Sequence, residues 1–320
     1  METVEKKRVR RMWKPLERDI LRTLLYFDVF GHPLTLDELQ HFLPADQVTG
    51  VEAALSRARL REVISTDQGF LRMANRPSSI GAERLVKELR ARSYWKAARI
   101  VAALLRRMPF IRAVGLSGEL SKGVASPNTD IDLFIVTAQR RVWIVRTLLT
   151  AVKKLFLFNK RRFFCINYLV AEDHLTVDDR NICSALEIVT LRPLGGEAVH
   201  LAYLHANAWV AEYFPNAYRR QTLALREGRE RRPWTQRVVE FLLPRGMGDR
   251  LEQHLFHFWK RVWDHRYAHL SAADRTKQFR TTPYLSTAYG EDHFAIILER
   301  YAARLRVYGC NGATSSPRQS

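Results

Sequence analysis

The sequence predicts an α/β protein with a mixed central sheet, preceded by a small domain of helices with a hairpin and followed by a helical domain. Short apolar runs at 113–116, 133–136 and 163–170 alternate with helical periodicity, a pattern typical of an α/β core. Residues 15–72 carry three short helical patterns and then two strand-like runs. After residue 195 the periodicity is nearly all helical, which predicts a separate helical part.

The composition is that of a globular protein with a large positive charge. The chain of 320 residues is 47% hydrophobic and 27% charged, as in ordinary globular domains. Three scattered cysteines without a CxxC pair predict a reducing, cytoplasmic location without disulfides. No apolar run reaches the length of about 18 residues that a membrane span needs. The net charge of +19 indicates a polyanionic partner, nucleic acid or an anionic membrane surface, or else arginine-rich helix faces.

The first 76 residues are expected to form one domain after a basic arm (residues 1–14). Thr35 and Glu38 have the spacing of a capping box at a helix start. The expected elements are helices over 16–27, 36–42 and 47–60 and strands over 63–65 and 69–72. This order resembles a winged helix-turn-helix, which implies that the third helix would face DNA. The arginines it would present are Arg57, Arg59 and Arg61. Docking to a protein or to a neighbouring domain is the alternative.

A long amphipathic helix or a helix pair is expected over 80–108, after a boundary at Pro77. Its basic residues are expected to face solvent. Its apolar side chains are expected to pack on the sheet that follows. Those side chains are Leu85, Leu89, Ala97, Val101 and Leu104.

A glycine-bearing polar loop follows the apolar run at 113–116. It starts at Ser117 and Gly118 and continues through Lys122 and Ser126. A hydroxyl, free backbone N–H groups and a residue without Cβ are what a phosphate group needs for close approach. The loop is therefore a candidate phosphate-binding segment.

Two aspartates, Asp130 and Asp132, open the next apolar run. Side chains alternate along a strand, so we expect both carboxylates on one face and Ile131 and Leu133 in the core. Neighbouring carboxylates repel each other unless a cation neutralises them. Oxygen ligands favour Mg²⁺, which usually binds together with phosphates. The alternative is a hairpin whose aspartates merely solvate an exposed face.

The order apolar strand, Ser117-Gly118, polar loop and Asp130-Ile131-Asp132 resembles the nucleotidyltransferase superfamily, which includes polymerase-beta-like enzymes. The resemblance implies an enzyme that moves a nucleoside monophosphate from a nucleoside triphosphate to an acceptor hydroxyl. Asp130 and Asp132 would be the metal ligands and catalytic acids, with a core over 77–195. Many members have Gly-Ser where this chain has Ser-Gly.

The resemblance also implies the roles of the loop. Ser117, the backbone at Gly118, and Lys122 would cradle the phosphates, with Ser126 in the same loop. A helical domain, here 196–310, would shape the acceptor side of the cleft.

The third strand, at 163–170, departs from the family pattern. Where the family carries a third acid, this strand offers Asn167, which can ligate Mg²⁺ through its carbonyl but cannot act as a base. Glu187, on a helix expected over 179–190, is the candidate replacement, unless it simply faces solvent. Alternatively, the reaction proceeds with only two metal ligands, because phosphoryl and nucleotidyl transfer depend mostly on positioning and charge neutralisation.

Two further functions stay open. A weakened core could sense nucleotide without turnover while the N-terminal domain binds DNA, as a regulatory protein. An RNA-modifying transferase would explain the charge but has no distinct motif.

The C-terminal part is expected to consist of helices joined by short breaks. The expected breaks are a turn at 193–196, a charged link at 219–232 and a loop at 244–248. The last ten residues, 311–320, are expected to form a disordered tail.

Overall fold

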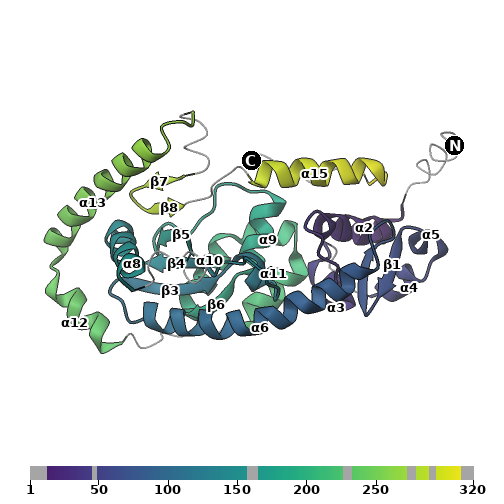
Figure 1. Cartoon of the computed structure of the whole chain (residues 1–320), viewed down its shortest axis with the longest axis horizontal. Coiled ribbons are helices and arrows are strands. Elements are labelled where there is room, and N and C mark those ends of the chain that lie inside the picture. Colours follow the sequence, from purple (N-terminus) through teal and green to yellow (C-terminus); the bar gives the residue numbers. More distant parts are fainter. Residues whose placement is uncertain are drawn as a thin grey trace. The chain divides into compact units, whose positions relative to one another are not determined.

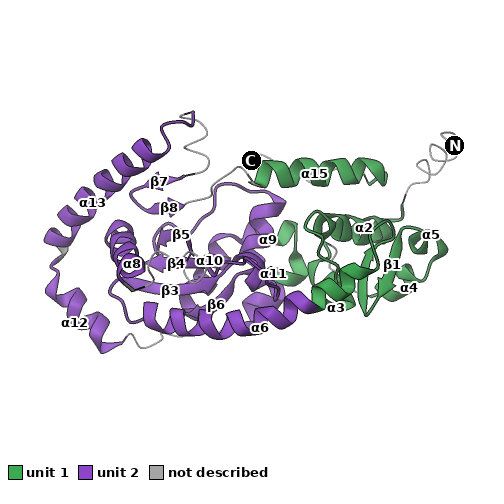
Figure 2. Ribbon diagram, viewed as in Figure 1, with its two compact units in different colours: residues 1–85, 211–217, 293–320 green, residues 86–210, 218–292 purple. Residues whose placement is uncertain are grey.

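The computed structural model describes residues 13–44, 49–156, 165–225, 233–271, 279–287 and 293–310. The chain forms two compact units, shown in Figure 2. Unit 1 comprises residues 1–85, 211–217 and 293–320, and unit 2 comprises residues 86–210 and 218–292. The expected domain boundaries at 76, 195 and 310 stay predictions. The start of the basic arm and the tail at 311–320 lie outside the described residues.

Unit 1 contains the expected N-terminal helices and hairpin, together with a C-terminal helix (Figure 1). Its elements are α2 (Pro15–Asp28), α3 (Leu36–Phe42), α4 (Val51–Leu55), α5 (Ala58–Arg61), β1 (Ile64–Asp67), β2 (Phe70–Met73) and α15 (His293–Val307). The capping box of α3 is confirmed, because Thr35 N donates to Glu38 Oε2 at 2.9 Å and Glu38 N donates to Thr35 Oγ1 at 3.2 Å.

The expected single helix over 47–60 is wrong, since the described part is divided into α4 and α5. The backbone of Arg57 is extended, with φ −69° and ψ 136°, which separates α4 from α5. Arg57, between the two helices, pairs with Glu17 at 2.8 Å, and the Arg59 guanidinium lies 3.8 Å from the centre of the Trp13 ring. Two of the three arginines expected to face DNA are therefore engaged within the unit, and DNA binding stays a prediction.

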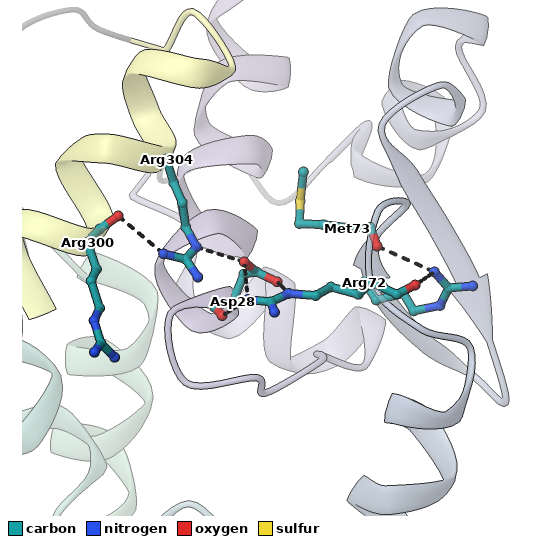
Figure 3. Close-up of polar contacts among 6 residues, drawn as sticks. Asp28, Arg72, Met73, Arg300 and Arg304 are labelled. Atoms are coloured by element: carbon teal, nitrogen blue, oxygen red, sulfur yellow. Dashed lines mark hydrogen bonds and ion pairs between the residues drawn. The ribbon is translucent and has the colours of Figure 1, made fainter.

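Helix α15 is tied to α2 through Asp28 (Figure 3). Arg304 Nε donates to Asp28 Oδ2 at 2.8 Å, and Arg76 Nε donates to Asp28 Oδ1 at 2.6 Å. Burial raises the pKa of Asp28, but the hydrogen bonds from the two arginines outweigh it and hold the pKa below its ordinary value. This doubly bound carboxylate joins segments from both ends of the chain in one unit.

Unit 2 is built on a six-stranded mixed sheet with the order β6-β3-β4-β5-β8-β7. The strands are β3 (Ile111–Leu116), β4 (Asp132–Thr137), β5 (Cys165–Ala171), β6 (Arg192–Gly195), β7 (Thr281–Thr282) and β8 (Leu285–Thr287). Strands β4 and β5 pair in parallel, and the other neighbouring strands pair antiparallel. The expected α/β class with a mixed sheet is therefore confirmed at this level.

Helices surround this sheet (Figure 1). They are α6 (Ser79–Leu105), α7 (Gly118–Ser121), α8 (Val142–Phe156), α9 (Ile182–Thr190), α10 (Glu197–Ala206), a 3-10 helix (Ala208–Glu212), α11 (Pro215–Ala224), α12 (Trp234–Leu242) and α13 (Arg245–Arg266). Helices α6 and α11 begin in unit 1 and continue into unit 2. Among the described helices, none is both long and apolar enough to cross a bilayer.

The expected packing of α6 is wrong for three of its leucines. Leu85, Leu89 and Leu104 are exposed, whereas Ala97 and Val101 are partly buried against the core. The face of α6 buried in the core carries Ala91, Tyr94, Ala98, Ala102 and Leu105. Small side chains let the helix backbone approach its neighbours closely, so the face rich in alanine packs inward, while Leu85, Leu89 and Leu104 face solvent.

Several expected breaks are part of regular elements. Residues 192–195 form edge strand β6, which tolerates Pro193 because an edge strand does not need every backbone N–H. The hairpin β7–β8 was not expected at all. Its two strands are only two and three residues long, and β8 pairs with β5, which lies far away in the sequence. The first residues of the expected charged link, 219–224, belong to α11, and 226–232 lie outside the described residues. Most of the expected loop at 244–248 is the first turn of α13.

Candidate active site

The bend after β3 lies against the first residue of β4. Ser117 N donates to the Asp132 carbonyl at 3.0 Å, next to the paired residues Leu116 and Leu133. Gly118 has a φ of 68°, and a Cβ at this position would overlap the Asp132 carboxylate. Glycine is required here both by its backbone conformation and by the approach of the carboxylate. The close contact of bend and aspartate is the first feature of the candidate site.

We expect Gly118→Ala to displace Asp132 and to cost more than the backbone strain of about 1–2 kcal/mol for a left-handed non-glycine residue. Gly123→Ala is the matched control, because Gly123 has a φ of 77° but a Cβ there would meet no atom within 4 Å. Thermal unfolding of both variants measures the difference. Equal destabilisation would show that the contact with Asp132 is unimportant.

Asn167 occupies a bulge in β5 beside Asp132. Leu133 pairs with Ile166 and Phe134 pairs with Tyr168, so Asn167 is the extra residue between them. Bulges of this kind often redirect a side chain near an active site. Asn167 Nδ2 donates to Asp132 Oδ1 at 2.5 Å, and Cys165 Sγ donates to Asn167 Oδ1 at 3.0 Å. The residue that departs from the family pattern is therefore in direct contact with the central aspartate.

The Asp132 carboxylate is affected by two other carboxylates at this point. The pKa of Asp132 is raised from 3.8 to about 7, first by burial and then by the negative charges of Glu187 and Asp130. The hydrogen bond from Asn167 and the positive charge of Lys122 act in the opposite direction. Asp130 itself precedes β4, which begins at Asp132, so the expectation that both aspartates lie within the strand is wrong. The site nevertheless concentrates negative charge, which a cation would compensate.

Lys122 and Glu187 close one side of the site. Lys122 Nζ donates to Glu187 Oε1 at 2.8 Å and to the Gly118 carbonyl at 3.1 Å. The Glu187 side chain, on α9, is 38% exposed. Glu187 therefore lies among the predicted site residues and remains reachable from solvent.

Glu119, a residue without a predicted role, organises the loop. Its carboxylate accepts the Ser126 hydroxyl and N–H, both at 3.0 Å, and the Thr129 hydroxyl at 2.6 Å. Burial raises the pKa of Glu119, but these hydrogen bonds outweigh it and lower the pKa below its ordinary value. Ser126 is thus held within the loop's own network. The sequence could have indicated this role, because Glu119 directly follows the bend and a Ser-x-x-Thr turn, from Ser126 to Thr129, comes soon after it.

Asp130 and Asp132 are carboxylates of the kind that could hold a magnesium ion. In the described part of the chain, no group of three or more His, Cys, Asp or Glu side chains is arranged to hold a metal. Mg²⁺ is commonly bound by one or two carboxylates together with substrate phosphates and water, rather than by a complete protein cage. Asp130 and Asp132 provide such a two-carboxylate set.

The structure gathers most of the predicted site residues. Those brought together are Ser117, Gly118, Lys122, Asp130, Asp132, Asn167 and Glu187, with Ser126 in the adjoining loop. Their geometry is the basis for assigning a function, because the chain matches no protein-family model, no curated protein and no solved structure.

Proposed function

We propose that unit 2 is a Mg²⁺-dependent nucleotidyltransferase that moves a nucleoside monophosphate from a nucleoside triphosphate to an acceptor hydroxyl. The observation that carries the proposal is the Asp132 carboxylate against the Ser117-Gly118 bend, where the negative charges of Asp130 and Glu187 also act on it. Partly buried negative charge is unfavourable without a compensating cation. A divalent ion bound with a polyphosphate would satisfy both the carboxylates and the bend.

The phosphate-binding roles follow from these positions. Asp130 and Asp132 would hold Mg²⁺ through carboxylate oxygens. When bound, the ion would neutralise charge on the triphosphate and on the departing pyrophosphate. Ser117 and the backbone at Gly118 would position the phosphates, with Lys122 adding positive charge next to them.

The proton of the acceptor hydroxyl needs a base. Asn167 cannot take it, and its amide instead orients the Asp132 carboxylate. Glu187 is the accessible carboxylate, and its ion pair with Lys122 holds it in place. In this proposal Glu187 accepts the proton while the acceptor oxygen attacks the α-phosphorus.

The test uses purified protein, Mg²⁺ and each α-labelled nucleoside triphosphate. Asp130→Asn is compared with Asp178→Asn, a matched change at an exposed aspartate outside the site. We expect nucleotide-dependent thermal stabilisation and label transfer by the wild type and by Asp178→Asn, and their loss in Asp130→Asn. Equal stabilisation and labelling by all three proteins would contradict the proposal.

The contact between Asn167 and Asp132 favours a second candidate, a nucleotide-sensing regulatory protein with a catalytically weakened core. A site without the third acid can still bind triphosphate, and unit 1 would then carry the DNA-binding role. Stabilisation by nucleotide and Mg²⁺ without product from any acceptor would identify this function. Salt-dependent binding of duplex DNA would support the DNA-binding role of unit 1.

A further inference from the structure

Helix α12 is seated on the rest of unit 2 by its polar side. Gln236, only 2% exposed, donates its amide to the carbonyls of Arg106, Met108 and Ile111, at 2.7–3.0 Å. Glu240 accepts the Phe110 N–H at 2.7 Å. It also accepts two bonds from the Arg112 guanidinium, at 2.8 and 3.0 Å. Turning the helix over would leave these buried groups without partners, so its orientation is well determined.

The apolar side of α12 consequently faces outward. Trp234 is 74% exposed and Phe241 is 85% exposed. Four exposed apolar side chains recur at helical spacing, and Val239 is also exposed: the four are Trp234, Val238, Phe241 and Leu242. Further exposed apolar residues lie on the helices that adjoin α12, namely Ile100 and Leu104 on α6 and Met247 and Leu251 on α13. We call the set on α12 the α12 face. Apolar side chains clustered in this way commonly mark an interaction site.

Positive charge is interleaved with the α12 face. Arg237 is exposed at the position between Trp234 and Phe241 on the same side of the helix. A hollow of about 360 Å³ opens where α6 ends and α12 begins, lined by Arg106, Arg107 and Trp234 together with Ala103, Pro233 and Thr235. Arginine side chains beside an exposed tryptophan suit a phosphate group attached to an apolar body.

We propose that the α12 face docks on an anionic phospholipid bilayer surface, with lipid phosphate at the Arg106–Arg107 hollow and Trp234, Phe241 and Leu242 in the acyl boundary. An interfacial helix combines these features: protruding aromatic and aliphatic side chains with arginines that meet anionic headgroups. The chain's net charge of +19 adds attraction to such a surface. The inference is independent of the chemistry at Asp132.

The charge and shape of the α12 face disfavour other occupants. A symmetric contact between two copies of this chain would bring the α12 face and its arginines from both copies into one interface and so concentrate positive charge there. The bases of a single-stranded nucleic acid would stack on Trp234, but aliphatic side chains such as Val238 and Leu242 contribute little to such binding. A lipid bilayer accepts the aromatic, the aliphatic and the basic side chains together.

The test is co-sedimentation of the full chain with phosphatidylcholine vesicles that contain or lack phosphatidylglycerol. The test variant is Phe241→Ser/Leu242→Ser, whose side chains are exposed. Leu223→Ser, on α11 of the same unit and 80% exposed, is the control. We expect wild type and control to bind the anionic vesicles and the double variant to bind roughly tenfold more weakly or worse. Quenching of Trp234 by brominated phosphatidylglycerol, absent in Trp234→Phe, would locate the contact.

Three results would overturn the proposal. The first is no binding of the wild type to anionic vesicles, and the second is equal binding by the double variant. The third is evidence of a different occupant. The wild type would then form a dimer in light scattering, or bind RNA, without binding vesicles, and the double variant would lose that dimer or that RNA binding. Circular dichroism of the double variant confirms that it is folded.

Discussion

Asp132→Asn is expected to stabilise the protein at neutral pH in the absence of divalent cations, while removing its capacity to bind Mg²⁺ with nucleotide. The pKa of Asp132 is raised to about 7 in the folded state, from an ordinary value of 3.8. Between these pH values Asp132 releases its proton in the unfolded chain but retains it in the folded chain, so the contribution of Asp132 to stability falls as the pH rises and is constant above about 7.

One pKa unit corresponds to about 1.4 kcal/mol, so the interval from 3.8 to about 7 corresponds to at most about 4 kcal/mol. Asparagine cannot ionise, and the variant should lack this pH-dependent loss. Urea unfolding in EDTA at pH 5 and pH 8 measures it, with Asp178→Asn as the control. A variant that is less stable than wild type at pH 8, or that keeps the wild-type pH dependence, would contradict the expectation.

The opposite change, Asn167→Asp, is expected to destabilise the metal-free protein. Asn167 Nδ2 lies 2.5 Å from Asp132 Oδ1, so a carboxylate there would place a second negative charge against a partly buried aspartate. An uncompensated buried charge costs on the order of 3 kcal/mol. Added Mg²⁺ should restore stability, because an ion that binds only the folded state stabilises it in proportion to RT ln(1 + [L]/Kd).

Asn181→Asp is the matched control for this variant. Asn181 Oδ1 accepts the N–H groups of Cys183 and Ser184 at the start of α9, a position where aspartate also serves. Thermal unfolding at pH 8 with EDTA and with Mg²⁺ should show a Mg²⁺-dependent gain that is larger in Asn167→Asp than in wild type or control. A variant as stable as wild type in EDTA would exclude the electrostatic account.

Asn167→Asp also separates the two proposed functions. If the core is a regulatory domain weakened by the missing acid, the variant should form product where the wild type forms none. If the wild type already transfers nucleotide with Glu187 as base, Glu187→Gln should abolish transfer in the wild-type background. Labelled product from each protein under identical conditions decides between them.

Local features of the fold were predictable because neighbouring residues determine them. The capping box at Thr35 and Glu38 and the hairpin of β1 and β2 depend on side chains only a few positions apart. Failures occurred where distant partners decide: β6, β7 and β8 are two to four residues long and exist through pairing with other strands. Periodicity also could not tell which side of an amphipathic helix faces inward.

The candidate site shows the same division. The sequence by itself determined that Ser117, Gly118, Asp130 and Asp132 belong to one strand–loop–strand segment, because strand and turn preferences are encoded locally.

Only the tertiary structure decided that Asn167 contacts Asp132 through a bulge and that α12 presents its apolar side outward. These outcomes depend on hydrogen bonds to partners far along the chain. Gln236 and Glu240, for example, bind backbone groups near residue 110 and so reverse the usual rule that the apolar side of a helix is buried.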